Sequence, residues 1–424
     1  MEPERNILII VQNLPVPFDR RVWQEATSLQ KAGFGVAVVC PKKKIYTKSY
    51  EELEGIHIYR YSLIYEANEG VAGYFVEFIY CWIASLWLAL KAYVHRPFHA
   101  IHACNPPDTF FALAMLFRPL GIKFVFDHHD LCPELYVAKG GQRGGFLHRA
   151  LLMLERLTFR AADAVISVNQ SHRDIALRRG RVDASKVAIV RSGPPRIWAD
   201  HCAAEPQLKY GRKYLVVYLG EMCRQDGVEH LLHAIRCYAD SYPRDTMFAL
   251  IGGGPDQQRM KELAEHLELN DWVHFTGRVP NEILWQYLAT ADVCVDPDPY
   301  TEFNNLSTMN KIIEYLAFGK PVVAFDLTEH RRSAQDAAVY VHPNDDAKLC
   351  AAIRELLIDW ERRQTMGHYG QKRFREHLAW ENSEEALVKM YSSLFHYRED
   401  RVGTASVVVN NGLNSNGDDI HSVS

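Results

Sequence analysis

Short apolar runs alternate with amphipathic segments along most of the chain, which is the pattern of strands separated by helices. The runs that we interpret as strands in the first half lie at 6–12, 34–40, 56–61, 100–104, 123–127, 163–168 and 186–191. A second series follows at 214–219, 247–251, 272–276, 292–296, 321–325 and 337–341. Because repeats of strand, helix and strand form parallel sheets, we predict an α/β chain with two Rossmann-like domains.

A polar, weakly patterned stretch separates the two series. Residues 192–195 read Ser-Gly-Pro-Pro, which breaks regular structure, and 199–212 carries no clear apolar period. We therefore place an N-terminal domain at 1–198 and a C-terminal domain at 199–378. Residues 399–424 are rich in Asn, Ser, Gly and Asp, and we expect them to form a disordered tail.

Composition narrows the function classes. The 424 residues are 48% hydrophobic and 24% charged, which is ordinary for a soluble chain of this size. A net charge of −4 argues against a nucleic-acid partner, since such proteins normally carry a basic surplus. Nine scattered cysteines without a C-x-x-C pair suggest reduced thiols. The first residues lack the pattern of a signal peptide, so we expect a cytoplasmic location.

The most apolar stretch lies at 78–90, where thirteen uncharged residues stand between Glu77 and Lys91. This length favours a buried or interfacial helix over a membrane-spanning one. Two interpretations stay open. The helix faces the core of the N-terminal sheet, or it contacts a membrane, for which Trp82 and Trp87 are typical interfacial residues.

The most informative segment runs from 297 to 326. It reads as a polar loop followed by a helix that Ser307 or Thr308 caps, with Lys311 in the first turn and Glu314 one turn later. Free N–H groups and the dipole of a helix start attract an anion such as a diphosphate, and Lys311 adds a full charge. Glu314 is placed to accept the hydroxyl protons of a ribose. An ordinary surface pair of Lys311 and Glu314 explains the same spacing.

The run S-T-M-N-K-x-x-E-Y at 307–315 resembles the donor site of family-four retaining glycosyltransferases, which have the two-domain GT-B fold. It is most similar to a bacterial branch that assembles polysaccharides. Many relatives carry two glutamates eight positions apart; Glu314 matches the second, and Leu306 stands at the first, which in the family contacts the transferred sugar. The resemblance spans roughly 5–397. It implies that a helix at 379–398 crosses back to cover the N-terminal domain.

Polar residues also follow the strand at 123–127, where the chain continues as His128, His129 and Asp130. Carboxyl ends of parallel strands are where open α/β sheets bind ligands. A metal site is a rival interpretation, but adjacent histidines on an extended chain point to opposite sides and rarely chelate one ion. The resemblance implies that His129 contacts the donor sugar with Asp130 beside it. His128 is the alternative, because the register is ambiguous by one position.

Arg20 and Arg21 stand at the mouth of the loop after the first strand. This loop lacks G-x-G-x-x-G, which argues against a dehydrogenase. The two arginines could bind the phosphate of an acceptor, or they form a solvated pair at a helix start.

Loops after strands of the second series supply further donor-site candidates. The resemblance implies that the first loop neutralises the donor diphosphate, but Glu221 and Asp226 are acidic there. Arg224 is then the residue of this loop that could supply a positive charge to the diphosphate. Alternatively, it is an exposed arginine without such a role. The resemblance places the remaining candidates beside the donor or its base: Gly220, Gly253, Gly277, Arg278 and Val279.

We therefore predict a retaining glycosyltransferase that moves a sugar from a nucleoside-diphosphate sugar, with UDP favoured, to a lipid-linked or saccharide acceptor in cell-surface polysaccharide assembly. Its expected catalytic residues are His129, Asp130 and Lys311. Glu314 is expected at the ribose. The residues expected at the diphosphate are Ser307, Thr308, Lys311 and Arg224. Because cations and helix dipoles hold the leaving group, we expect no metal and no cofactor. Peripheral contact with the inner face of the cytoplasmic membrane is expected from 78–90 and the arginine pair.

Two rival functions belong to other classes. A nucleotide-sugar epimerase can share the GT-B fold, and it would convert the donor without any acceptor. A non-catalytic partner subunit would keep the fold and bind nucleotide without transferring sugar, which the leucine at position 306 and the acidic first loop suggest.

Overall fold

The computed structural model describes residues 5–43, 45–63, 71–200 and 203–409. The N-terminal strands are β1 (Asn6–Ile10), β2 (Gly35–Pro41), β3 (Tyr50–Leu53), β4 (Ile56–Tyr61), β5 (Ala100–Cys104), β6 (Lys123–His128), β7 (Ala164–Ser167) and β8 (Val187–Ile189). They form one sheet in the order β3-β4-β2-β1-β5-β6-β7-β8. All neighbours are parallel except β3, which pairs antiparallel with β4 at the edge. The prediction missed β3, because its sequence YEEL carries no apolar run.

The N-terminal helices are α1 (Arg20–Lys31), α2 (Val71–His95), α3 (Phe110–Phe117), α4 (Cys132–Ala138), α5 (Phe146–Ala161) and α6 (Gln170–Arg178). Helix α1 begins where the Asp19 carboxylate accepts the N–H of Val22, and it ends before Gly33, whose φ of 92° suits glycine. Helices α2, α3 and α5 cover one face of the sheet, whereas α1 packs on the other.

Helix α2 is longer than the apolar stretch that predicted it. Among the described residues it contains one segment, Val76–His95, that is long and apolar enough to cross a membrane. Only 28% of the most apolar part of this segment is buried in the protein. One side of the helix, with Cys81 and Ala89, packs into the core, while Trp87 and Val94 on the other side are 68% and 81% exposed. The core-facing interpretation therefore holds for only one side of the helix. The other side is exposed, so the structure leaves room for the membrane contact that was the alternative.

The C-terminal domain repeats the plan. Its strands are β9 (Tyr214–Leu219), β10 (Thr246–Ile251), β11 (Val273–Gly277), β12 (Val293–Asp296), β13 (Val322–Phe325) and β14 (Ala338–Val341), in the order β11-β10-β9-β12-β13-β14. Its helices are α7 (Val228–Ser241), α8 (Gln257–His266), α9 (Asn281–Thr290), α10 (Glu302–Leu306), α11 (Asn310–Ala317), α12 (Thr328–Ala334), α13 (Asp346–Ile358) and α14 (Trp360–Arg373). The predicted α/β class with two Rossmann-like sheets is confirmed.

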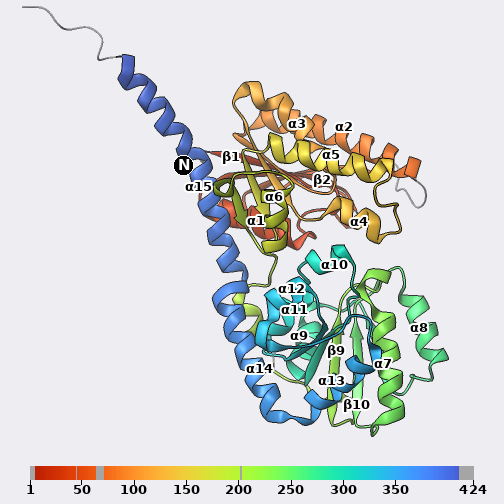
Figure 1. The fold of residues 1–424 in the computed structure, drawn as a ribbon. Helices are drawn as coiled ribbons and strands as arrows, with labels where there is room; N and C mark the ends of the chain where they lie inside the picture. The colour runs from red at the N-terminus through yellow and green to blue at the C-terminus, as the bar shows by residue number, and fades with distance from the viewer. Residues whose placement is uncertain (1–4, 44, 64–70, 201–202, 410–424) are drawn as a thin grey trace, which may run out of the picture.

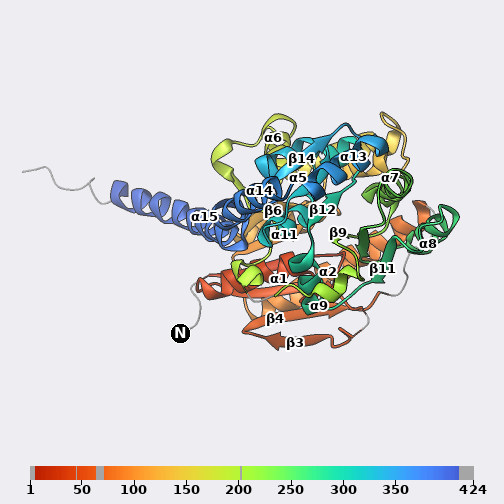
Figure 2. The same ribbon diagram turned by 90° about the horizontal axis from the view of Figure 1, so that it is seen from below.

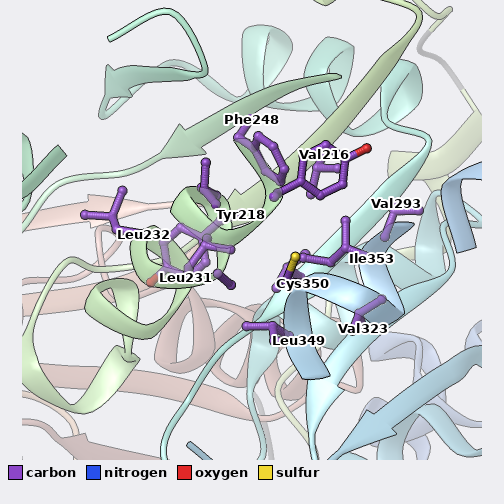
Figure 3. Packing of buried hydrophobic residues seen from close by; sticks show 14 of the residues in the cluster. Val216, Tyr218, Leu231, Leu232, Phe248, Val293, Val323, Leu349, Cys350 and Ile353 are labelled. Carbon is purple, nitrogen blue, oxygen red and sulfur yellow. The ribbon is translucent and has the colours of Figure 1, made fainter. Parts of the chain in front are cut away.

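Apolar side chains of α7 and α13 fill one face of the C-terminal sheet (Figure 3). Leu231 and Leu232 of α7 and Ile353 of α13 meet Val216 and Phe248 of the sheet, and all five are essentially buried. Close packing of this kind fixes the carboxyl ends of β9 and β12, which carry the loops of the site described below.

The last helix, α15 (Trp380–Val409), leaves the C-terminal domain and runs along the N-terminal one (Figure 1). The indole N–H of Trp380 donates to Ser28 Oγ at 3.0 Å, and Tyr391 Oη lies 2.9 Å from His102 Nδ1. The helix continues past 398 to Val409, into the segment expected as a tail, and 410–424 lie outside the described residues.

Candidate active site

The two domains meet at the first turn of α1. The Arg20 guanidinium donates to Glu314 Oε1 of α11 at 2.8 Å and stacks on Trp198 at 4.6 Å from the ring centre. Seen from below, α11 lies next to α1 (Figure 2). The sequence analysis considered Arg20 for an acceptor phosphate and Glu314 for the ribose, and the structure places the two in direct contact.

Arg21 turns in the opposite direction, into the N-terminal domain. It is 8% exposed, and its guanidinium lies 2.9 Å from carboxylate oxygens of both Asp127 and Glu25. Its Nε donates to His129 Nε2 at 2.7 Å. Burial would raise the pKa of Asp127, but Arg21 and His129 outweigh it and hold this pKa well below its ordinary value. The solvated-pair interpretation is wrong for Arg21, because the side chain is buried and holds His129 instead of lining an open surface.

The two adjacent histidines do point to opposite sides. His128 is fully buried, where its ring packs on Phe159, and burial lowers its pKa well below the ordinary value. The side chain of His129 keeps 17% of its surface exposed and contacts the Asp127 carboxylate. The backbone N–H groups of His129 and Asp130 both donate to Asn105 Oδ1, at 2.6 and 3.0 Å. Burial raises the pKa of Asp130.

Sequence reasoning missed Asp127 and Asn105 as supports of His129. Each stands at the carboxyl end of its strand, one on β6 and one just after β5, and that position was the available signal.

The predicted cap of α11 is wrong. The helix begins at Asn310 after Met309, and no side chain caps it. A short helix, α10, forms first, and Ser307 Oγ donates back to the carbonyl of Phe303 within it. Thr308 Oγ1 instead accepts from Asn169 Nδ2 of the N-terminal domain at 3.0 Å. Both hydroxyls are therefore engaged elsewhere, and Thr308 joins the two domains near the start of α11.

Lys311 lies inside a group of three carboxylates. Its Nζ is 2.6 Å from Asp298, 3.2 Å from Asp226 and 3.5 Å from Asp296, and the residue is 8% exposed. Burial alone would lower the pKa of Lys311, but the carboxylates hold it well above its ordinary value. Burial, followed by Asp296, raises the pKa of Asp298 to about 7. Lys311 thus reaches the acidic first loop from across the site, because Asp226 belongs to that loop.

The alternative of an ordinary surface pair is wrong for Lys311 and Glu314, since both are buried and have different partners. Burial raises the pKa of Glu314, and Arg20 opposes this shift. Gly220 lies against Lys311, because a Cβ there would stand 3.3 Å from Lys311 Cε and 2.6 Å from Tyr218 Oη.

A cavity of about 1070 Å³ opens between the domains beside this group. The end of α4 at 137–140 lines one side, and Arg224, His230 and Arg259 line the other. The remaining predicted donor residues lie at the ends of β10 and β11. Gly253 and Gly277 both approach Gln257, Val279 packs in the C-terminal core, and Arg278 crosses to the ring of Phe18 in the N-terminal domain at 5.8 Å.

Two groups of side chains have the spacing of metal ligands among the described residues. The first joins Glu25, His102, Cys104 and Asp127, and the second joins Asp296, Asp298 and His330. A protein cation already contacts each group, Arg21 in the first and Lys311 in the second.

Two facing Rossmann-like domains with a C-terminal helix that crosses back define the GT-B fold (Figure 1). Sucrose-phosphate synthase from Thermosynechococcus elongatus shares it with a TM-score of 0.73 at 21% identity, covering 93% of this chain and 100% of that chain. The structure of Anabaena HepE in complex with UDP and glucose has a TM-score of 0.69 at 14% identity, covering 92% of this chain and 100% of that chain. The predicted GT-B architecture is confirmed.

Sequence comparison identifies the family. Residues 19–193 match the Glycosyl transferase 4-like domain, and 213–359 match Glycosyl transferases group 1. Alpha-maltose-1-phosphate synthase of Mycolicibacterium smegmatis is 28% identical over 296 residues, which are 64% of this chain and 73% of that protein. Two further curated relatives align over less than half of their own length, at 43% and 49%. The chain belongs to the group 1 glycosyltransferases of family four, enzymes that transfer a sugar from a nucleotide sugar.

Proposed function

We propose that this protein transfers a sugar from a UDP-sugar, with retention of configuration, to a lipid-linked or saccharide acceptor in the assembly of cell-surface polysaccharide. One observation carries the proposal: consecutive residues of α1 contact the two halves of the site, Arg20 touching Glu314 and Arg21 touching His129. A donor held by Glu314 would therefore lie within reach of His129. The likeness to HepE, whose structure contains UDP and glucose, supports the choice of base.

The donor would enter where Arg20 now holds Glu314. The ribose hydroxyls would replace the guanidinium on this carboxylate, and the diphosphate would extend toward the start of α11 and Arg224. The leaving diphosphate gains negative charge as the glycosidic bond breaks, so fixed cations stabilise the transition state more than the ground state. Lys311 lies at the centre of this region but is shared among carboxylates, so Arg224 is needed as a further cation.

His129 would contact the sugar, and Arg21 with Asp127 would fix its ring. Asp130 lies next to it and is held through Asn105. We propose that the reaction needs no metal ion, because Lys311 and Arg224 take its place at the phosphates. We also propose a cytoplasmic location at the inner face of the membrane, where a lipid-linked acceptor would be presented to the N-terminal domain.

A non-catalytic partner subunit remains a second candidate because Leu306 and Asp226 depart from the family pattern in the donor loops. Thermal-shift measurements with UDP-, GDP- and ADP-sugars test the donor first, because a ligand of the folded state raises the melting temperature. UDP-sugars should raise it for the wild type but much less for Glu314→Ala. Incubation of the selected radiolabelled donor with membrane lipid extract should then label a lipid product. Donor binding without a product would support the subunit, and conversion of the donor alone would support an epimerase.

A further inference from the structure

Exposed apolar side chains of the described chain concentrate on one side of the N-terminal domain. More than half of its exposed large apolar residues lie on α2, on α3 with the turn that follows it, and on α5. These helices lie side by side on the same face of the sheet (Figure 1). The most informative members, here called the apolar face, are Ile79, Ile83, Trp87 and Val94 of α2, Leu116 of α3 and Phe146 of α5.

The charges around the apolar face are almost all positive. The sequences of α2, α3 and α5 contain two carboxylates, Glu77 and Glu155, and Glu155 is fully buried. The exposed charged residues on α2 and α5 are cations, namely Lys91, Arg149, Arg156 and Arg160. The three arginines make no ion pair within the described residues. The whole chain carries a net charge of −4, so this positive region is a local feature.

The opposite side of α2 excludes a membrane-spanning role in this fold. Cys81, Ser85 and Ala89 lie on that side at successive turns and are completely buried against the sheet. Inserting the whole helix would expose the apolar core of the N-terminal domain. An amphipathic arrangement with one packed side and one exposed apolar side, flanked by arginines, suits the plane of a membrane interface.

We propose that the apolar face docks this protein on an anionic lipid bilayer, with the arginines of α5 in contact with the headgroups. Trp87 and Phe146, at 68% and 90% exposure, would enter the interfacial layer, which aromatic side chains prefer. The cations select an anionic surface over a neutral one. The apolar face would be the surface by which the protein lies at the inner face of the membrane. The inference rests on that location, which is part of the proposed function.

Vesicle flotation of the full chain tests the proposal. The vesicles are phosphatidylcholine alone, or phosphatidylcholine with phosphatidylglycerol, at low and high salt. One variant combines Trp87→Glu with Val94→Glu, and a second replaces Arg149, Arg156 and Arg160 by Gln. The matched control combines Ile358→Glu with Trp360→Glu, residues that are 59% and 62% exposed on the C-terminal domain. Melting temperature and UDP-sugar binding are measured on every variant.

The wild type and the control should float with anionic vesicles and not with neutral ones. The arginine variant should bind about a hundredfold more weakly, since each cation near the surface adds to the attraction. The Glu variant should lose flotation while keeping its melting temperature and nucleotide affinity. Absence of wild-type flotation, or equal loss in the control, overturns the proposal without touching the donor site. A wild-type dimer that the Glu variant alone converts to monomer would overturn it in favour of a second copy on this face.

Discussion

Lys311 should contribute to stability far more than an exposed lysine does. Its ammonium lies within 3.5 Å of three carboxylates in a buried part of the C-terminal domain. The substitution Lys311→Met leaves Asp226, Asp296 and Asp298 facing one another without their cation. Loss of one partner from a buried charge group costs about 3–5 kcal/mol. For a domain of this size the melting temperature should fall by about 6–20 °C.

Urea and thermal unfolding at neutral pH measure this effect. Lys348→Met is the control, because Lys348 is 67% exposed and its one ion pair among the described residues is with Asp345 just before its helix, so the midpoint should change little. Adding Asp298→Asn to Lys311→Met should restore part of the loss, since it removes one of the repelling carboxylates. The reasoning is refuted if Lys311→Met unfolds with the wild type, or if the added Asn lowers stability further.

Three further predictions concern the same site. Burial raises the pKa of Asp298 from 3.8 to about 7, so the folded state binds the proton of this carboxyl more tightly than the unfolded state does. The stability that this proton contributes is therefore lost as the pH rises from about 3.8 to about 7. Urea midpoints should show that loss in the wild type and not in Asp298→Asn. His129→Ala should lower the rate of sugar transfer by about a hundredfold or more, and its melting temperature should fall less than that of His128→Ala, which should cost about 2–4 kcal/mol of stability. Glu314→Gln should weaken UDP-sugar binding about tenfold by calorimetry, and an unchanged affinity would remove its ribose role.

The sequence was sufficient to predict both sheets and most of their helices. Apolar runs mark every parallel strand because both faces of a parallel sheet are covered, so apolar residues predominate in each strand. Helix α11 ends shortly before Gly319, whose φ of 62° is one that glycine adopts without strain. The edge strand β3 was not predicted, because two adjacent glutamates stand at its centre and leave no apolar run.

The partners of the site residues were not predictable from spacing. Whether Thr308 caps α11 or accepts from Asn169 depends on how closely the two domains approach, which no local pattern encodes. Lys311 and Asp226 are far apart in sequence, and their contact follows from the packing of α11 against the loop after β9. The sequence shows that Leu306 and Asp226 differ from the residues that the family carries at these positions. It does not show that Lys311 contacts Asp226 and so brings positive charge to the acidic loop, which the structure does.

Arg20 and Arg21 are adjacent in the sequence but differ in burial and in their partners. The side chain of Arg20 is 52% exposed, whereas the carboxylate of Glu314 with which it pairs is buried. In the proposed function the ribose would replace Arg20 on this carboxylate, and the released guanidinium would return to solvent. Arg21 is buried between Asp127 and Glu25, so its contact with His129 persists whether or not Glu314 is released. One turn of helix therefore supplies two contacts: one between the domains, which the proposed donor would displace, and a fixed support for the residue that would meet the sugar. In the proposed function, binding of the nucleotide and separation of the domains would be coupled through Arg20, because Arg20 contacts the carboxylate that the ribose would take. The geometry around His129 would stay unchanged, because Arg21 holds it from within the N-terminal domain.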